Sequence, residues 1–114
     1  MSIKTISYVL SHPLAKRHRL RCLYIYFWWQ LRGLFNRHPA TISWVDNSRL
    51  RLTKGMRGAT GNLYCGLHEW PDMAFALHLL RPGDLFIDVG ANVGTYTVLA
   101  ASVAKASVIA LEPS

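Results

Sequence analysis

Hydrophobic residues recur at helical spacing in the first third of the chain. A short helix is predicted over residues 3–10, because the residue before Pro13 avoids the helical conformation and ends it. A longer helix is predicted from about Leu14 to Phe35, where apolar residues return every three or four positions. This stripe consists of Leu20, Tyr24, Phe27, Leu31 and Leu34. Asn36 in a left-handed cap is expected to end the helix before Pro39.

The pattern changes to strict alternation after the second helix. Residues 41–53 hold two β-rich runs on either side of an Asp-Asn-Ser turn, which predicts a hairpin. The next segment, residues 54–62, contains three glycines and is expected to be the boundary between the two halves of the chain. We therefore predict a helix-and-hairpin extension over residues 1–57 and a second domain that begins at residue 58.

The second half has the pattern of a parallel sheet. A helix is predicted from Pro71, and the apolar runs at residues 85–89 and 107–111 have strand length and composition. Both runs are expected to be buried on both faces, as strands of parallel sheets are. A glycine loop at 90–94 and a helix from Thr95 separate them. This order predicts an α/β fold that opens a parallel sheet.

Charge divides the chain in the same two parts. Residues 1–57 hold 11 Lys and Arg against one acid, a net charge of +10, whereas residues 58–114 hold two against five, a net charge of −3. The hydrophobic share of 51% is enough for a core and excludes wholesale disorder. Only the first part has the charge to meet phosphates or an anionic membrane.

The basic helix at 14–35 therefore has three interpretations. Its apolar stripe could dock onto the rest of the protein or onto a second copy in a homo-oligomer. It could instead lie peripherally on an anionic membrane surface, which basic residues, tryptophans and tyrosines suit. Nucleic-acid binding rests on charge alone, so we do not expect that partner. The uninterrupted apolar part, Cys22–Trp29, is too short for a spanning helix, and no signal-peptide cleavage site follows it.

Cysteine and histidine spacing adds little chemistry. Cys22 and Cys65 fit no paired-ligand pattern, and reduced thiols in a cytoplasmic protein are the simplest interpretation. The five histidines show no metal-ligand spacing, so no metal site is expected. Residues 68–70 are expected to form a loop packed on the domain rather than part of a site.

The loop after the first parallel strand, Phe86–Gly94, is the main candidate for a ligand site. It has no Gly-Lys-Ser/Thr, which excludes a P-loop. Asn92 and Thr95 stand where a dinucleotide fingerprint requires its second and third glycines. What remains is Asp88 followed by Gly90 and Gly94. An acid before the loop repels a pyrophosphate but holds an ammonium, so an amino-acid tail fits.

Glu112 is the second piece of this candidate site. It ends the next strand, 18 residues after Gly94, where an acid can accept hydrogen bonds from both hydroxyls of a ribose. A nucleoside at one end and an amino acid at the other describe S-adenosylmethionine, which we therefore expect as the cofactor.

The segment GDLFIDVGANVGTYTVLAASVAKASVIALEPS resembles the opening of FkbM-type S-adenosylmethionine-dependent methyltransferases, and GNLYCGLHEWPDMAF resembles their lead-in. The likeness covers roughly residues 58–114. It implies a Rossmann-like class I methyltransferase fold and O-methylation of a sugar or natural-product hydroxyl, with a small molecule or glycan as acceptor. By position, the resemblance places the ribose of the cofactor on Glu112. It places the methionine end on Asp88, Gly90, Asn92 and Gly94.

The chain is short for such an enzyme. The fold needs about seven strands, and only two of them are predicted here. We expect the sequence to be the amino-terminal part of a methyltransferase that is inactive alone, with the acceptor pocket and any catalytic base beyond residue 114.

Overall fold

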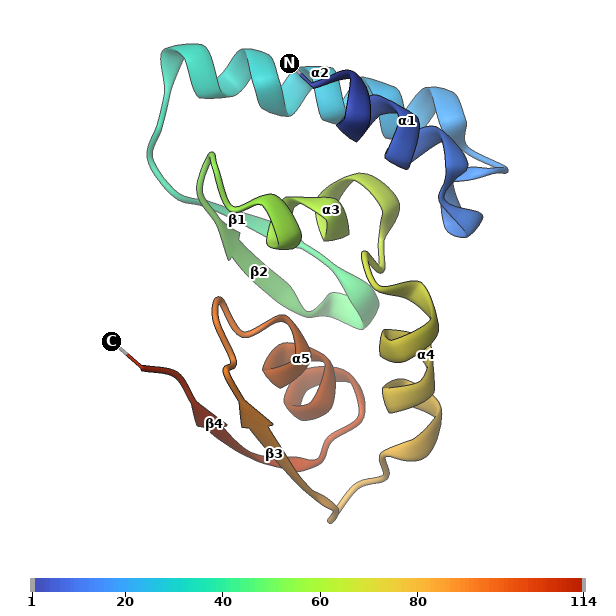
Figure 1. The fold of residues 1–114 in the computed structure, drawn as a ribbon. Coiled ribbons are helices and arrows are strands. Elements are labelled where there is room, and N and C mark those ends of the chain that lie inside the picture. The colour runs from blue at the N-terminus through green and yellow to red at the C-terminus, as the bar shows by residue number, and fades with distance from the viewer. Residues whose placement is uncertain (1, 114) are drawn as a thin grey trace. The chain divides into compact units, whose positions relative to one another are not determined.

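The structure of the chain is a computed structural model that describes residues 2–113, without the side chain of Arg57. It mixes helices with two two-stranded sheets (Figure 1). Its contacts divide it into two units, one of Met1–Ala40 with Leu52–Trp70 and one of Thr41–Arg51 with Pro71–Ser114. These units differ from the predicted parts 1–57 and 58–114, because the hairpin groups with the second unit and residues 52–70 with the first.

The first unit is helical. Its elements are α1 (Ile3–Ser11), the 3-10 turn η1 (Pro13–Ala15), α2 (Arg19–Phe35) and α3 (Arg57–Cys65). The three α-helices pack on one another (Figure 1). The short first helix is confirmed. No helix among residues 2–113 has the length and hydropathy needed to cross a membrane.

The long helix α2 begins later than the sequence predicts. Pro13–Ala15 forms a separate 3-10 turn, which the His12 ring holds by accepting the N–H of Leu14 at 3.2 Å. The predicted end at Phe35 is confirmed, but the left-handed cap at Asn36 is wrong. Asn36 is extended (φ −141°), and its side-chain Oδ1 accepts the N–H of His38 at 2.9 Å. This local turn satisfies the asparagine without a left-handed backbone.

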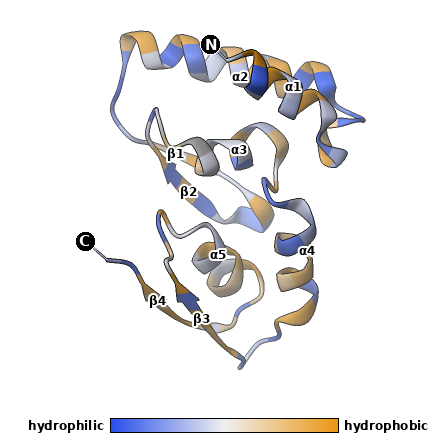
Figure 2. Cartoon of the chain, in the orientation of Figure 1, coloured by the Kyte–Doolittle hydropathy of each residue, from blue (hydrophilic) through white to orange (hydrophobic). Residues whose placement is uncertain are grey.

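The inward face of α2 is not its predicted apolar stripe. The buried residues of α2 are Cys22, Tyr26, Trp29 and Gly33. The ring of Tyr26 packs edge-on against Tyr64 of α3, with 5.2 Å between the centroids. The five residues of the predicted stripe are all exposed instead. The hydrophobicity of α2 is therefore distributed over two sides (Figure 2).

The glycine-rich segment 54–62 is not a loop between halves. Its second part lies in α3, where Thr60, Gly61 and Asn62 are buried. A Cβ on Gly61 would collide with the imidazole of His68. Gly61 is therefore needed for close packing inside the first unit rather than for a turn.

Among residues 2–113, the second unit holds most of each strand. Its elements are β1 (Ala40–Ser43), the 3-10 turn η2 (Val45–Asn47), β2 (Arg49–Leu52), α4 (Trp70–Leu79), β3 (Leu85–Val89), α5 (Thr95–Val98), the π-helical turn η3 (Leu99–Val103) and β4 (Ser107–Leu111). β1 and β2 pair as the predicted hairpin. Asp46 and Asn47 have φ of 45° and 64°, the left-handed conformations that reverse the chain there.

β3 and β4 form the predicted parallel pair. The register places Leu85 beside Ser107 and Val89 beside Leu111. α5 and η3 connect the strands and cover one face of the pair (Figure 1). The expectation of burial on both faces is wrong, because the other face exposes a row of apolar side chains. They are Leu85, Ile87, Val89, Ile109 and Leu111.

Candidate functional site

The glycine loop turns sharply at the carboxyl end of β3. Gly90, Asn92 and Gly94 have φ of 73°, 52° and 83°. Glycine adopts these values freely, and asparagine is among the side chains that tolerate them best. The three positions that the sequence singled out are therefore the three left-handed residues that shape the loop.

The end of β4 binds the loop backbone. The N–H groups of Gly90 and Ala91 both donate to the carbonyl of Leu111, at 2.7 and 3.1 Å. The N–H of Gly94 donates to the carbonyl of Ala91 at 2.8 Å. A phosphate-binding loop needs such N–H groups free and convergent. Here they are used within the protein, so the loop is not a phosphate cradle.

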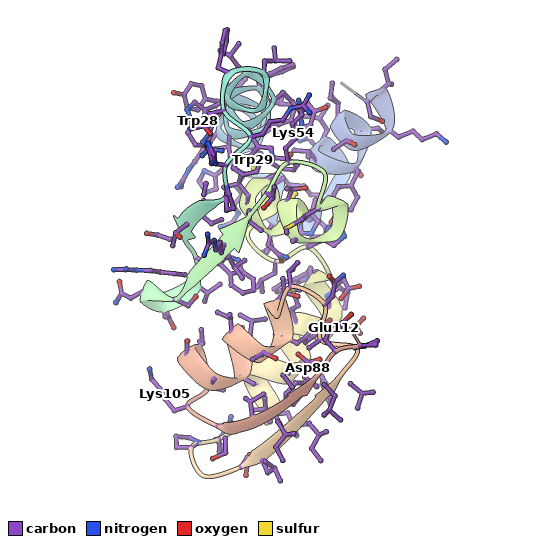
Figure 3. The ribbon with its side chains drawn as sticks, turned by 90° about the vertical axis from the view of Figure 1, so that its left-hand side faces the viewer. Trp28, Trp29, Lys54, Asp88, Lys105 and Glu112 are labelled. Carbon is purple, nitrogen blue, oxygen red and sulfur yellow. The ribbon has the colours of Figure 1, made fainter. Side chains whose placement is uncertain are left out.

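Glu112 lies against the same loop. Its Oε2 accepts the N–H of Asn92 at 2.6 Å, across 20 residues of sequence. The carboxylate is exposed, so its remaining oxygen can meet a ligand. Glu112 thus joins the loop to the end of β4, and Figure 3 shows it at the same edge of the sheet as Asp88.

Asp88 is held from the helix side. The hydroxyl of Thr97 in α5 donates to its Oδ2 at 2.6 Å, and Asp88 is half-buried. Among residues 2–113 no hydrogen bond engages Oδ1. The carboxylate is therefore fixed in orientation with one oxygen left for another donor.

The electrostatics of this edge are negative. Residues 82–104 contain no Lys or Arg, and Asp88 and Glu112 end two adjacent parallel strands. Such a site favours ammonium or sulfonium groups and hydroxyl donors, and it opposes anionic groups. The structure thus brings together all five residues that the sequence predicted. These are Asp88, Gly90, Asn92, Gly94 and Glu112.

Two partners in this site were not predicted from the sequence. Thr97 is the donor to Asp88, and the backbone of Asn92 is the donor to Glu112. Thr97 stands three residues after Gly94, on the first turn of the helix that follows the loop, and this place was the available signal. No sequence signal indicated that the backbone N–H of Asn92 would donate to Glu112.

Residues 68–70 belong to the first unit, and Trp70 begins α4 rather than lying in the predicted loop. The hydroxyl of Tyr8 is 2.7 Å from both the Nδ1 and the carbonyl oxygen of His68. Asn62 Oδ1 accepts the N–H of His68 at 2.8 Å. Burial lowers the pKa of His68. The negative charge of Glu69 opposes this, and electrostatic repulsion from His12 adds a smaller lowering. His68 is thus a packed residue of the first unit.

The remaining chemistry-bearing groups do not form a second reactive centre. Burial, with a smaller contribution from Cys22, raises the pKa of Cys65 to about 12, which keeps its thiol protonated. Both cysteines are buried and free. Among residues 2–113 no three His, Cys, Asp or Glu side chains gather as metal ligands. A cavity of about 570 Å³ between α1, α2 and α3, bordered by Lys4 and Lys54, does not touch the glycine loop.

A scan against protein-family models finds no match to this chain, and searches of curated proteins and of solved structures also find none. The function must therefore be argued from the residues and the geometry of the site.

Proposed function

We propose that the edge formed by the glycine loop and Glu112 is the cofactor half-site of an S-adenosylmethionine-dependent methyltransferase. The observation that carries this proposal is the hydrogen bond between Asn92 and Glu112, because it sets a strand-end carboxylate beside a loop whose N–H groups are already used. The parallel order β3, loop, helix, β4 supports the proposal, because a Rossmann-like sheet would begin with the same order of elements.

Each residue has a defined role in the proposal. Asp88 holds the ammonium of the cofactor's methionine end, and Thr97 orients its carboxylate. Glu112 accepts the ribose hydroxyls. Gly90 and Gly94 keep the backbone free of a Cβ at the positions nearest the ligand. The cofactor supplies an activated methyl group on a sulfonium, and the negative edge suits that positive charge.

A nicotinamide or flavin dinucleotide is disfavoured by the same geometry. Its pyrophosphate would need free loop N–H groups and would approach two carboxylates. The N–H groups of Gly90, Ala91 and Asn92 are used by Leu111 and Glu112.

The reaction we propose is O-methylation of a sugar or natural-product hydroxyl, in the manner of the FkbM-type enzymes, in a cytoplasmic protein. The acceptor is a small molecule or a glycan. In this reaction the described residues of the chain supply groups that position the cofactor. We expect no turnover by this chain alone.

Binding of S-adenosylhomocysteine tests the site without requiring turnover. Titration into the ¹⁵N-labelled chain should shift the amide signals of Gly90, Asn92 and Gly94. Asp88→Asn and Glu112→Gln keep the shape of each side chain and remove its charge. Each should weaken binding about tenfold, as loss of a charge-assisted hydrogen bond does.

Asp84→Asn is the matched control, because Asp84 precedes β3 at the opposite end of the strand and its Oδ2 accepts only the local N–H of Arg81. This variant should bind S-adenosylhomocysteine as the wild type does. Unchanged affinity in both site variants would overturn the assignment. So would equal shifts of the loop amides on addition of a nicotinamide dinucleotide.

A further inference from the structure

The side of α2 that points away from its buried face is apolar along its whole length. We call it the outward face of α2, and it consists of Leu20, Tyr24, Phe27, Leu31, Leu34 and Phe35. Leu20, Leu34 and Phe35 are 85%, 70% and 84% exposed. Trp28, at the margin of this face, is 44% exposed (Figure 3). A helix on a water-facing surface normally carries polar side chains there.

The orientation of α2 is fixed by its other side. Tyr26 and Trp29 are nearly fully buried, and the hydroxyl of Tyr26 accepts the N–H of Ser2 at 3.2 Å. The stem of Lys54 crosses the helix at Gly33, where a Cβ would collide with it. Rotating α2 to bury its outward face would expose this packed side, so the outward face must find a partner outside the unit.

Positive charge gathers at the amino-terminal end of this face. Residues 1–40 hold seven Lys and Arg and no acid. Four of them precede or begin α2 and are exposed, namely Lys16, Arg17, Arg19 and Arg21. Cations near a helix N-terminus are opposed by the helix dipole, so they do not serve the stability of α2. They do suit an anionic partner.

A groove of about 360 Å³ opens along the same helix. Phe27, Leu31 and Leu34 line it, together with Gln30 and the exposed Lys54. Apolar walls with one ammonium group suit an aliphatic chain that ends in an anionic group. A lipid with a negatively charged headgroup has this chemistry.

From these observations we propose that α2 lies flat on an anionic lipid bilayer. Its outward face enters the boundary between headgroups and acyl chains, while the basic residues around its start contact lipid phosphates. A nucleic acid would need the cations across the face itself, and the outward face carries none. A second copy would bring the same positive charge against this one, and like charges repel.

Co-sedimentation of the chain with lipid vesicles tests this proposal. Vesicles of phosphatidylcholine with phosphatidylglycerol should bind the chain at low salt. Phosphatidylcholine alone should bind it weakly, and high salt should release much of the bound protein. Equal binding to both vesicle types, or none to either, would overturn the proposal.

Paired variants separate the two contributions. Leu20→Ser with Leu31→Ser should reduce vesicle binding about tenfold or more. Phe75→Ser with Leu79→Ser removes two comparably exposed apolar side chains from α4 and should change nothing. Arg17→Ala with Arg19→Ala should reduce binding about 25-fold at low salt. Arg49→Ala with Arg51→Ala removes the same charge from β2 and should have a much smaller effect.

Fluorescence gives a readout that does not depend on a folded double variant. Lipids brominated in the upper acyl chain should quench the tryptophan emission of the wild type, and Trp28→Phe should lose most of that quenching. Equal quenching in Trp28→Phe would overturn the proposal. A wild-type dimer that Leu20→Ser with Leu31→Ser converts to a monomer, without vesicle binding, would assign the face to a second copy. Tighter binding to duplex DNA than to vesicles would also overturn it.

Discussion

Single residues of the first unit show how closely its packing depends on one side chain, His68. The backbone of α3 approaches the imidazole at Gly61. The carbonyl oxygen of His68 accepts hydrogen bonds from the His12 ring and from the Tyr8 hydroxyl. The His12 ring accepts the N–H of Leu14 at Nδ1, so its Nε2 carries the proton and donates to the carbonyl of His68 at 3.1 Å. The Tyr8 hydroxyl reaches the same carbonyl. His68 thus joins α1 to α3.

Gly61→Ala should destabilise the chain by about 1–3 kcal/mol, because the new methyl group would displace the half-buried imidazole of His68. Gly58→Ala, in the same helix, meets open space and should be neutral or stabilise by up to about 1 kcal/mol. Urea unfolding followed by circular dichroism measures both. Similar losses in the two variants would contradict the close approach at Gly61.

Titration of His68 should make stability depend on pH. Its pKa is lowered in the folded chain by burial first; the charge of Glu69 opposes this, and His12 adds a smaller lowering, so the unfolded state binds the proton more readily. The stability it contributes is present above the unfolded pKa of about 6.5 and is lost as pH falls towards the lower folded pKa. Urea unfolding between about pH 7 and pH 5 should show a smaller loss in His68→Gln than in the wild type. An identical loss would contradict this role.

The site residues were predictable from sequence to different degrees. Asp88 and Glu112 are acids at strand ends, and Gly90 and Gly94 interrupt an apolar pattern, so their types and places carried the signal. The orientation of Asp88 by Thr97 depends on how α5 rotates over the sheet. That rotation is set by packing, which residue spacing does not encode.

At the scale of elements, periodicity predicted where helices and strands lie better than which face is covered. α2 and β3 end where the pattern changes, at Phe35 and Val89. The odd positions of β3 were expected to be buried and are exposed, and the apolar stripe of α2, whose partner was left open, is exposed as well. An apolar face requires cover, but the sequence does not say whether the cover is another element of the same unit or a separate partner.

The two faces of the parallel pair should respond differently to truncation. Ile87 is 55% exposed, so Ile87→Ala should lower the free energy of unfolding by less than about 1 kcal/mol. Leu99 lies beneath the other face and is 1% exposed, so Leu99→Ala should lower the free energy of unfolding by about 2–5 kcal/mol. Thermal and urea unfolding compare the two variants. An equally large loss for Ile87→Ala would mean that its face is covered in solution.

At the scale of the whole molecule, charge separates the two units as it separates the two halves of the sequence, though less sharply. The unit of Met1–Ala40 with Leu52–Trp70 has nine Lys and Arg and one acid, a net charge of +8. The other unit has four basic residues and five acids, a net charge of −1. The proposed lipid surface therefore belongs to the strongly basic unit and the proposed cofactor site to the nearly neutral one.

This division makes the two proposals separable. Asp88→Asn should weaken S-adenosylhomocysteine binding and leave vesicle binding unchanged. Leu20→Ser with Leu31→Ser should weaken vesicle binding and leave S-adenosylhomocysteine binding unchanged. Both measurements on both variants form a complete comparison on the intact chain. Loss of both activities in either variant, with helical circular dichroism retained, would contradict the assignment of the functions to separate units.

The π-helical turn η3 has a consequence for the length of the chain. Ala104 donates its N–H to Leu99, five residues back, so the turn holds one residue more than an α-helical turn would. Deleting one residue inside the turn would restore α-helical spacing and keep β4 in place, whereas deleting one after the turn would pull β4 along its neighbour by one position. Val108 would then move from the covered face of the sheet to the open one, and Glu112 would leave the loop. A single-codon deletion between Ala104 and Ala106 would thus dismantle the candidate site without altering any residue in it.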